Sequence, residues 1–466
     1  MHITIDRTSN TTLTKQVYQG IKANILTGIL SPNAKLPSSR QLSEELHLSR
    51  NVILEAYEQL LTEGYIEASR GSGTYVANDL LLTNYQHTKP LIKENVIGLR
   101  YEPLKGVIDF RTGVPNLSLF PKEKWGLLYK QTCEDLASFH LDYHEPRGCY
   151  ELRYSLANYL RRVRGTCCAP HQIIITTGAA QAFSLLSKCF SSVNKNVIVE
   201  DPLSKGIVDI LKQADMCVHP IAVDDLGMNT ALLPQALNPS LIFTTPSHQF
   251  PTGSLLPIKR RIELIHYARL KSSYIVEDDY DSEFRFEGSP IESMQSLDPE
   301  RVIYVGTFSK ILCPALRLGY IILPPFLVDI VRNLKYTEDI HSPVLEQLTL
   351  AKFINIGALD THIRKSKKFY QQKSQWVIQT LLSKFKENVT VMGHNAGIHL
   401  IAEFNEIIFD DVLLTKLESN GLRVTSVEKH ALVKGKHTHQ IMIGYGNLTD
   451  SEITKGIDII FKTIYS

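Results

Sequence analysis

Apolar side chains return at helical spacing through the first part of the chain. Between residues 13 and 28 this spacing predicts a helix that ends at Gly28, because glycine commonly follows the last helical turn. The same spacing predicts two shorter helices over residues 38–46 and 49–63. A glycine-rich hairpin is predicted to join two strands over residues 65–76. Three helices followed by a hairpin are typical of a winged helix-turn-helix.

The longer remainder alternates short apolar runs with segments of helical pattern, which is typical of an α/β fold. Strands are predicted over residues 173–176, 197–200, 217–221, 241–244, 274–277, 302–305 and 318–323. Between them, helices are predicted over segments that include residues 151–163 and 258–270. A long helical stretch from Pro325 to about Lys386 precedes a smaller group of strands and helices over residues 389–466. These patterns predict a large α/β domain and a small C-terminal α/β domain.

The boundaries follow from where these patterns change. Residues 1–77 form the predicted winged helix-turn-helix, and residues 108–466 form the predicted α/β part. Residues 78–107 show neither helical nor strand periodicity, and we interpret them as a linker. A linker of this length could let one subunit's DNA-binding domain lie over the other subunit.

Composition places the chain among ordinary globular proteins. Of its 466 residues, 43% are hydrophobic and 21% are charged. No apolar stretch has the length of a membrane span, and the N-terminus lacks the pattern of a signal peptide. The seven cysteines show no metal-ligand spacing, and their odd number fits reduced thiols. We therefore expect a cytoplasmic protein without a metal site.

Charge gives little information about partners. The net charge is only +2, and in residues 1–77 Lys and Arg are about as numerous as Asp and Glu. DNA binding by the first domain must therefore depend on where individual side chains lie. One copy is expected to bind weakly, and two copies on a dimer would read paired half-sites.

The stretch Gly306–Tyr320 carries the clearest candidate for chemistry. Lys310 follows an apolar strand, with Thr307 and Ser309 before it and Arg317 after it. A lysine in apolar surroundings has a lowered pKa, and a neutral amine is the form that attacks an aldehyde to give a Schiff base. The neighbouring residues favour this interpretation over an ordinary surface lysine.

Two further stretches complete a recognisable set of groups. Residues 273–284 form an apolar run that ends in several carboxylates around Tyr280, and such an acid can pair with a protonated pyridine nitrogen. The phenol beside it can bind a ring hydroxyl. Residues 173–186 predict a strand, a small-residue turn and a helix, whose free N–H groups suit a phosphate. Together these groups describe a site for pyridoxal phosphate.

The same motifs carry a resemblance to a known family over nearly the whole chain. The motifs are Leu36-Pro-Ser-Ser-Arg40, Phe110-Arg-Thr-Gly-Val-Pro115, Thr245-Pro-Ser-His-Gln-Phe-Pro-Thr-Gly253, Glu277-Asp-Asp-Tyr-Asp-Ser-Glu-Phe284 and Gly306–Tyr320. In this order and spacing the chain resembles the MocR-type branch of the GntR bacterial regulators. The resemblance implies a winged helix-turn-helix fused to a fold-type I, class I aminotransferase-like domain that binds pyridoxal phosphate. It also implies a head-to-tail homodimer that binds a double-stranded DNA operator.

The resemblance assigns roles in the cofactor site. Lys310 would form the Schiff base with pyridoxal phosphate, and Tyr280 would bind its ring hydroxyl. Asp278 would pair with the pyridine nitrogen, although Asp279 stays an alternative because adjacent carboxylates cannot be separated by sequence. His248 would border the ring, or it is a structural histidine with satisfied hydrogen bonds. The expected phosphate ligands are Gly178, Ala179, Thr307, Ser309 and Arg317.

Roles on DNA follow in the same way. The positions that map to DNA contacts in related regulators are Ser38, Arg40, Ser49 and Arg50. Asn51 stands where those regulators commonly have threonine, which would change sequence preference. At the predicted wing tip, Arg70 beside Gly71 could approach a groove.

Two residues depart from the family pattern. Ser204 stands where relatives have an aromatic residue that stacks on the cofactor, and Met442 stands where they have an arginine for a substrate carboxylate. A carboxylate clamp needs a guanidinium group, which methionine lacks. Nearby cations that could replace it, or that are simply solvated, are Arg423, Lys434 and Lys436.

These departures bear on function. The first hypothesis is a transcriptional regulator whose aminotransferase-like domain senses a small molecule. That molecule is either pyridoxal phosphate itself, reporting vitamin B6 supply, or an amino compound that forms an aldimine on the cofactor. The alternative is an active aminotransferase with an added DNA-binding domain. The missing arginine favours sensing of the cofactor, with at most residual transamination.

Overall fold

The computed structural model describes residues 3–69, 72–78, 106–288 and 291–465. The chain divides into two compact units, Met1–Glu102 and Pro103–Ser466. Most of the linker predicted over residues 78–107 lies outside the described residues, so its bounds stay a prediction.

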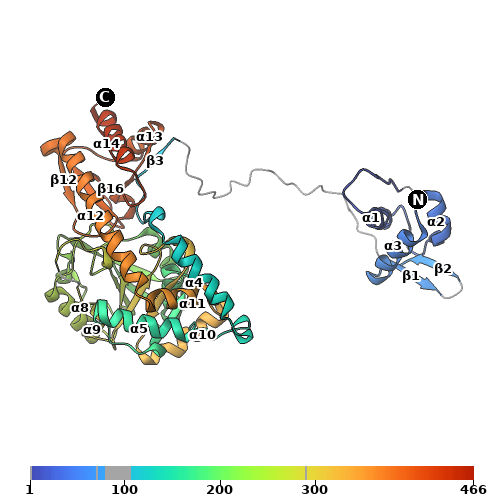
Figure 1. The fold of residues 1–466 in the computed structure, drawn as a ribbon, viewed down its shortest axis with the longest axis horizontal. Helices are drawn as coiled ribbons and strands as arrows, with labels where there is room; N and C mark the ends of the chain where they lie inside the picture. The colour runs from blue at the N-terminus through green and yellow to red at the C-terminus, as the bar shows by residue number, and fades with distance from the viewer. Residues whose placement is uncertain (1–2, 70–71, 79–105, 289–290, 466) are drawn as a thin grey trace. The chain divides into compact units, whose positions relative to one another are not determined.

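The first unit is a winged helix-turn-helix with its own core (Figure 1). Its elements are α1 (Leu13–Leu26), α2 (Ser39–Leu46), α3 (Arg50–Thr62), β1 (Ile66–Ser69) and β2 (Gly73–Val76). The hydroxyl of Ser38 accepts a hydrogen bond from the Gln41 amide and so caps α2. Apolar residues from all three helices and both strands fill the interior, among them Val17, Ile53 and Leu60. The predicted elements are confirmed to within about two residues at each end.

The second unit is built on an eight-stranded mixed sheet with strand order β4-β11-β10-β9-β8-β5-β6-β7. These strands are β4 (Ile173–Thr176), β5 (Asn196–Asp201), β6 (Cys217–Asp224), β7 (Gly227–Met228), β8 (Leu241–Thr244), β9 (Tyr274–Asp279), β10 (Val302–Thr307) and β11 (Gly319–Ile322). Strands β9 and β10 are parallel, and Val305 lies opposite Asp278. Their carboxyl ends therefore bring the two best candidate stretches to one edge of the sheet.

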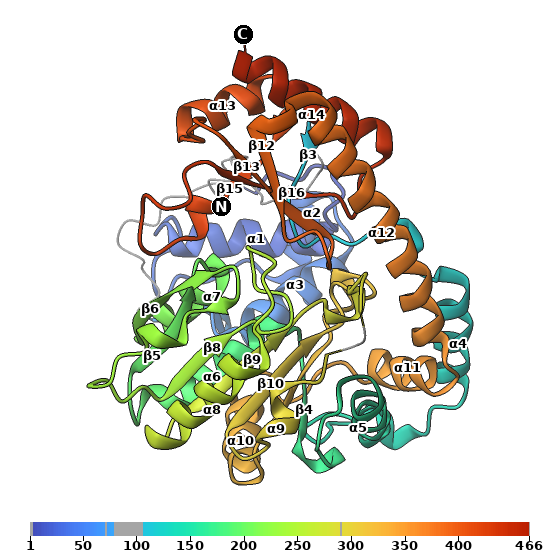
Figure 2. The ribbon, with the colours of Figure 1, turned by 90° about the vertical axis from the view of Figure 1, so that its left-hand side faces the viewer.

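Helices cover both faces of this sheet (Figure 2). They are α4 (Lys122–Glu134), α5 (Tyr150–Arg164), α6 (Ala179–Ser191), α7 (Lys205–Gln213), α8 (Ile258–Leu270), α9 (Met294–Leu297), α10 (Val328–Asp339) and α11 (Val344–Asn355). Successive strand residues point to opposite faces, so Ile174 packs with Phe183 of α6 whereas Ile173 and Ile175 pack with Leu156 of α5. The buried strands are therefore apolar on both sides, as their sequence pattern predicts.

A smaller group of elements follows the long helix α12 (Ala358–Phe385), which runs from the large part into it (Figures 1 and 2). Its sheet has the order β12-β13-β16-β15. The elements are β12 (Val389–Met392), β13 (His399–Phe404), α13 (Asp411–Ser419), β14 (Leu422–Arg423), β15 (Thr425–Ser426), β16 (Gln440–Gly444) and α14 (Asp450–Tyr465). Strand β3 (Ile108–Asp109), which follows the predicted linker, pairs in parallel with β14. The start of the second unit is therefore attached to its C-terminal part.

Short 3-10 helices complete the second unit. They are Leu117–Leu119, Ser138–Leu141, Pro170–Gln172, Thr230–Leu232, Ser282–Phe284, Pro314–Leu316, Pro325–Leu327, Lys386–Asn388 and Val427–His430. The long helical stretch predicted from residue 325 is divided into α10, α11 and α12. Pro343 precedes α11 and Gly357, in the left-handed conformation, precedes α12.

Two features are absent from the described residues. None of the helices there is both long and apolar enough to cross a membrane. Within the same residues, no group of three His, Cys, Asp or Glu side chains is arranged to hold a metal ion.

Replacing Leu60 with Ala should destabilise the first unit alone. Leu60 is fully buried in a core that shares no residue with the clusters of the second unit. We expect a loss of about 2–5 kcal/mol in the free energy of unfolding of that unit, as for other leucines truncated in a core. Scanning calorimetry should show the unfolding transition of the first unit moved to lower temperature and that of the second unit unchanged. Leu61→Ala, at a neighbouring residue that is 38% exposed, is the matched control and should change little. A shift of both transitions would show that the two cores unfold together.

Candidate functional site

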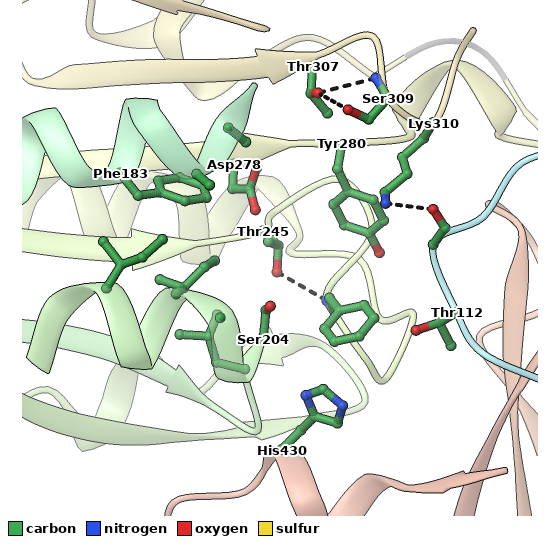
Figure 3. A pocket seen from close by; sticks show the side chains of 18 of the residues that line it. Thr112, Phe183, Ser204, Thr245, Asp278, Tyr280, Thr307, Ser309, Lys310 and His430 are labelled. Atoms are coloured by element: carbon green, nitrogen blue, oxygen red, sulfur yellow. Dashed lines mark hydrogen bonds between the residues drawn. The ribbon is translucent and has the colours of Figure 1, made fainter. Parts of the chain in front are cut away.

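A cavity of about 420 Å³ lies at the carboxyl edge of the large sheet (Figure 3). Its wall combines the ends of β9 and β10, the first turns of α6 and α7, and residues of the small part. The lining residues that bear on the argument are Thr112, Gly113, Ala179, Ser204, Thr245, Phe250, Asp278, Tyr280, Thr307, Ser309, Lys310, Arg317, His399 and His430. Most of the predicted cofactor residues therefore meet in one place.

Lys310 lies just beyond the end of β10 and points into this cavity (Figure 3). Its amine donates a hydrogen bond to the carbonyl of Gly113 at 2.6 Å. Burial lowers the pKa of the Lys310 amine, and the carboxylates of Asp281 and Asp278 partly oppose this effect. The direction agrees with the pKa predicted from sequence, so the neutral, nucleophilic form of the amine is favoured.

The adjacent carboxylates of Asp278 and Asp279 have different surroundings. Asp279 is bound by the Arg164 guanidinium at 2.8 Å and accepts hydrogen bonds from the hydroxyls of Tyr304 and Ser282. Asp278 lines the cavity, and it has no hydrogen bond or ion pair to any described residue. Burial, with Asp279 and Glu200 nearby, raises the pKa of Asp278 to about 8. The cavity therefore offers Asp278, not Asp279, to a cationic ligand.

Tyr280 lines the cavity, whereas His248 lies behind it. The Tyr280 hydroxyl is 3.1 Å from Nδ1 of His248, and that nitrogen is also 2.9 Å from the carboxylate of Asp281. His248 is buried and is not among the residues of the cavity wall. Small-part Gly397 passes so close that a Cβ there would lie 2.4 Å from the imidazole. The expectation that His248 borders a bound ring stays a prediction, and the position of His248 next to the Tyr280 hydroxyl favours a role in holding Tyr280.

The predicted phosphate residues form a polar cradle at one end of the cavity. Gly178 precedes α6 in a positive-φ conformation, so the first N–H groups of that helix carry no side-chain cap. A Cβ at Gly178 would lie 2.9 Å from the guanidinium of Arg317. The Thr307 and Ser309 hydroxyls lie 3.1 Å apart, and Arg317 donates to the Thr177 carbonyl at 2.5 Å. Hydroxyls, a guanidinium and helix N–H groups thus converge on one anion-sized space.

The two departures from the family pattern have different structural settings. Ser204 lies on the cavity wall immediately before α7, and the rings of Phe250 and His430 lie on the same wall with their centroids 5.2 Å apart. Met442 is buried in β16, where it packs with Ile401. Met442 is not among the residues of the cavity wall, so its side chain would not contact a ligand there.

The cations proposed to replace the missing arginine do not line the cavity either. Arg423 binds Glu418 at 2.7 Å, Lys434 donates to a main-chain carbonyl at 2.8 Å, and Lys436 lines a different hollow. Burial lowers the pKa of His430 and lowers that of His399 to about 3, so both imidazoles are neutral near pH 7. Among the described residues, the lysine and arginine side chains that line this cavity are Lys310 and Arg317.

Several residues of the wall were not predicted from sequence. Gly113 and Phe250 fall inside motifs that were noted, but nothing in the motifs showed that they would contact the site. His399 and His430 come from the small part, which folds back over the cavity. No local pattern around these two histidines indicates that contact.

In the first unit, the predicted DNA residues gather at the starts of α2 and α3. Ser49 precedes α3 and its hydroxyl makes no capping hydrogen bond, which leaves it free for another acceptor or donor. Arg50 and Asn51 are exposed in the first turn of α3, and Arg50 donates to the Ser39 hydroxyl at 3.3 Å. In a helix-turn-helix, this turn of the second helix meets base edges.

The remaining DNA candidates differ in how much the structure says of them. Ser38 caps α2, and Arg40 is exposed with a weak 3.4 Å pairing to Glu44. Such an exposed pair contributes little and is easily exchanged for a phosphate. Arg70 and Gly71, expected at the wing tip, lie outside the described residues.

Comparison with protein families divides the chain in the same way as the fold. Residues 13–76 match the bacterial regulatory proteins of the gntR family, and residues 130–460 match the class I and II aminotransferases. The second match covers the large sheet, the cavity and most of the small part.

Similar proteins span the whole chain. The uncharacterized HTH-type transcriptional regulator YhdI of Bacillus subtilis (strain 168) is 34% identical, over 97% of this chain and 96% of its own. The probable rhizopine catabolism regulatory protein MocR of Rhizobium meliloti is 31% identical, over 98% and 94%. The pyridoxine biosynthesis transcriptional regulator PdxR of Corynebacterium glutamicum is 31% identical, over 94% and 92%.

Solved structures match the second unit. A kynurenine aminotransferase of Pyrococcus horikoshii superposes with a TM-score of 0.71 at 26% identity, over 77% of this chain and 91% of that one. The fold-type I aminotransferase fold and its pyridoxal-phosphate-using family are thereby shown for residues that include the cavity. Taken with the whole-length relatives, these matches show that the chain belongs to the MocR-type regulators of the gntR family, DNA-binding transcriptional regulators with an aminotransferase-like domain.

Proposed function

We propose that the cavity binds pyridoxal phosphate and that its occupancy changes how the regulator binds DNA. The observation that carries this proposal is the composition of the cavity wall. It offers an amine, a partnerless carboxylate and an anion cradle, but no further Lys or Arg for a substrate carboxylate. Such a wall suits the cofactor as the ligand that is sensed.

The described residues fit the cofactor at its pyridine ring. Asp278 is partnerless, and burial holds its pKa at about 8, well above that of an ordinary carboxyl. A protonated ring nitrogen beside it would favour the ionised carboxylate, because an opposite charge offsets the cost of burial. Tyr280, held by His248 from behind, presents its hydroxyl to the same space. This arrangement supports an electrostatic role for Asp278 and an orienting role for Tyr280.

The phosphate end fits as well. Arg317, the hydroxyls of Thr307 and Ser309, and the first turn of α6 are the groups proteins commonly use for a phosphate. Ala179 lines the cavity at the start of α6, where the helix presents its free N–H groups. The Gly178 backbone must approach Arg317 closely, and a larger residue would push the guanidinium away.

Pyridoxal phosphate supplies an aldehyde that reacts with amines and a ring that delocalises charge. Lys310 is the amine that this chain offers, and burial lowers its pKa, which raises the share of the reactive neutral form. Ser204 contributes no aromatic face, although the rings of Phe250 and His430 line the same wall. We expect reversible uptake, as a sensor of cofactor supply requires.

The relatives support more than one effector class. PdxR is named for pyridoxine biosynthesis, which agrees with sensing of vitamin B6 supply. MocR is named for rhizopine catabolism, which fits a small-molecule effector other than the cofactor. An amino acid would need an anchor for its carboxylate, and Arg317 already belongs to the anion cradle. We therefore favour the cofactor itself, acting in a dimer on paired half-sites.

Titration with pyridoxal phosphate alone should change DNA affinity. The experiment uses cofactor-stripped full-length protein and a DNA duplex selected with this protein from a random-sequence library. We expect a saturable change of about five-fold or more, in the range usual for coupled sites. Fluorescence anisotropy at constant salt measures it, since salt alone shifts DNA affinity strongly.

Lys310→Ala is the matched variant for this titration. It should lose the covalent link to the cofactor, seen as a missing mass increase after borohydride reduction, and lose the response. A wild-type affinity that stays constant with cofactor, but changes with an amino compound, would contradict cofactor sensing.

Asp278→Asn and Asp279→Asn should have opposite profiles. Asp278 has no described partner, so its replacement should weaken cofactor uptake about ten-fold or more without lowering the free energy of unfolding. Asp279 holds Arg164 and Tyr304, so its replacement should cost about 3 kcal/mol or more of stability. Absorbance titration and urea unfolding measure the two effects. Equal losses of uptake in both variants would refute the assignment of the ring partner to Asp278.

Arg50→Ala should weaken DNA binding and leave cofactor uptake intact. One lost contact of this kind reduces affinity by roughly 10- to 100-fold. Lys15→Ala, exposed on α1 and outside the predicted contacts, is the control and should stay near wild type. Loss of cofactor uptake in Arg50→Ala would indicate misfolding instead of a lost contact.

A further inference from the structure

We infer that the carbonyl of Gly113 is the chain's own partner for Lys310, and that residues 111–115 pass the state of this lysine to the linker. The inference rests on the proposed function, because it explains how an occupied cavity could act on the DNA-binding domain. It assigns Gly113 a positioning role that the family motif does not specify.

The contact between Lys310 and Gly113 needs a glycine. Gly113 has a φ of +80°, and a Cβ built there would lie 2.8 Å from Nζ of Lys310. The backbone can thus approach the amine, and its carbonyl accepts the hydrogen bond at 2.6 Å. Any other residue would be strained and would press against the amine.

This hydrogen bond joins Lys310 to the short segment of residues 111–115. On one side the Phe110 carbonyl accepts from the Gly444 amide at 2.9 Å, and on the other the Asn116 amide donates to the Tyr370 hydroxyl at 2.8 Å. Between these anchors, no hydrogen bond other than that from Lys310 reaches residues 112–115 within the described chain. The backbone of Gly446 also packs closely against Val114 and Pro115, so Lys310 supplies the segment's described hydrogen bond while packing supplies its other contacts.

Residues 111–115 follow directly after strand β3, which is the first element after the predicted linker. Strand β3 pairs with β14 through the Ile108 amide on the Gly421 carbonyl at 2.8 Å and the Phe110 amide on the Arg423 carbonyl at 2.9 Å. Residues 78–107 join this strand to the DNA-binding domain. After β14 the chain continues through β15 to His430, which lines the cavity. Strands β3 and β14 are thus each followed, within a few residues, by a residue of the cavity wall, Gly113 after β3 and His430 after β14.

Cofactor uptake and the Gly113 bond compete for the same amine. When the neutral Lys310 amine condenses with an aldehyde, a carbon–nitrogen double bond forms and the aldehyde oxygen leaves as water with both amine protons. In its neutral form the imine nitrogen then has no hydrogen to donate to Gly113. A hydrogen bond of this type limits the resulting shift to roughly three- to ten-fold. Such a shift is modest, but it is within the range of known coupled sites.

Two variants of Lys310 separate the hydrogen bond from the covalent chemistry. Lys310→Met keeps an unbranched side chain that is shorter by the amine nitrogen and has no donor, so it imitates the released state without cofactor. Lys310→Arg keeps donors for Gly113 but does not condense with an aldehyde. Circular dichroism of both full-length variants checks that they fold.

Hydrogen exchange of the peptide covering residues 106–116 is the direct measurement. Without cofactor, Lys310→Met should exchange roughly three- to ten-fold faster than wild type and match cofactor-loaded wild type. Lys310→Arg should exchange slowly with and without pyridoxal phosphate. Exchange in Lys310→Met as slow as in cofactor-free wild type would overturn the inference. Lys335→Met removes a buried amine that binds Asp339, far along the chain, and should leave this peptide unchanged.

DNA affinity for the selected duplex separates this inference from the proposed function. Cofactor-free Lys310→Met should bind the duplex as cofactor-loaded wild type does. If wild type responds to pyridoxal phosphate but Lys310→Met keeps the affinity of cofactor-free wild type, the Gly113 route is wrong and cofactor sensing stands. If wild-type affinity is indifferent to pyridoxal phosphate, the proposed function fails. The exchange data then still decide whether Lys310 holds residues 111–115.

Discussion

The burial of the Lys310 amine is the constraint on which the site depends. An amine removed from water must be hydrogen-bonded, and the cost of burying its charge lowers its pKa. Its hydrogen bond goes to Gly113, and its pKa is lowered by burial. The same burial leaves Asp278 without a cation, with its pKa raised to about 8. The cavity therefore combines a reactive amine with a carboxyl group suited to a positive partner.

A network of buried hydrogen bonds and ion pairs surrounds the carboxylates at the end of β9. Arg164 and Tyr304 fix Asp279 at the end of β9, so the next residue back, Asp278, faces the cavity from the opposite side of the strand. Behind Tyr280, His248 and Asp281 form a second buried set. Apart from Asp278 and Tyr280, the residues of these two networks do not line the cavity. They determine which side chains do.

Among the described residues, the lysine and arginine side chains on the cavity wall are Lys310 and Arg317. Met442 is buried in the small sheet, and Arg423 is paired with Glu418 on the surface. A regulator needs binding that alters its DNA-binding state, and it gains nothing from turnover. The DNA-binding domain is nearly neutral, because Lys and Arg are about as numerous as Asp and Glu in residues 1–77.

The sequence by itself determined the order of elements, the two kinds of domain and the residues at the ends of β9 and β10. Those features depend on local periodicity and on a lysine or carboxylates that follow an apolar strand, all of which are visible in a short window. Tertiary structure alone placed Asp278 on the cavity wall and paired Asp279 with Arg164, left His248 off the wall and brought in Gly113, His399 and His430. These outcomes depend on contacts between segments far apart in the chain. Arg164 at the end of α5 pairs with Asp279 at the end of β9, although several helices and strands separate them in the chain. His399 and His430 of the C-terminal small part complete the cavity wall. No pattern of neighbouring residues contains that information.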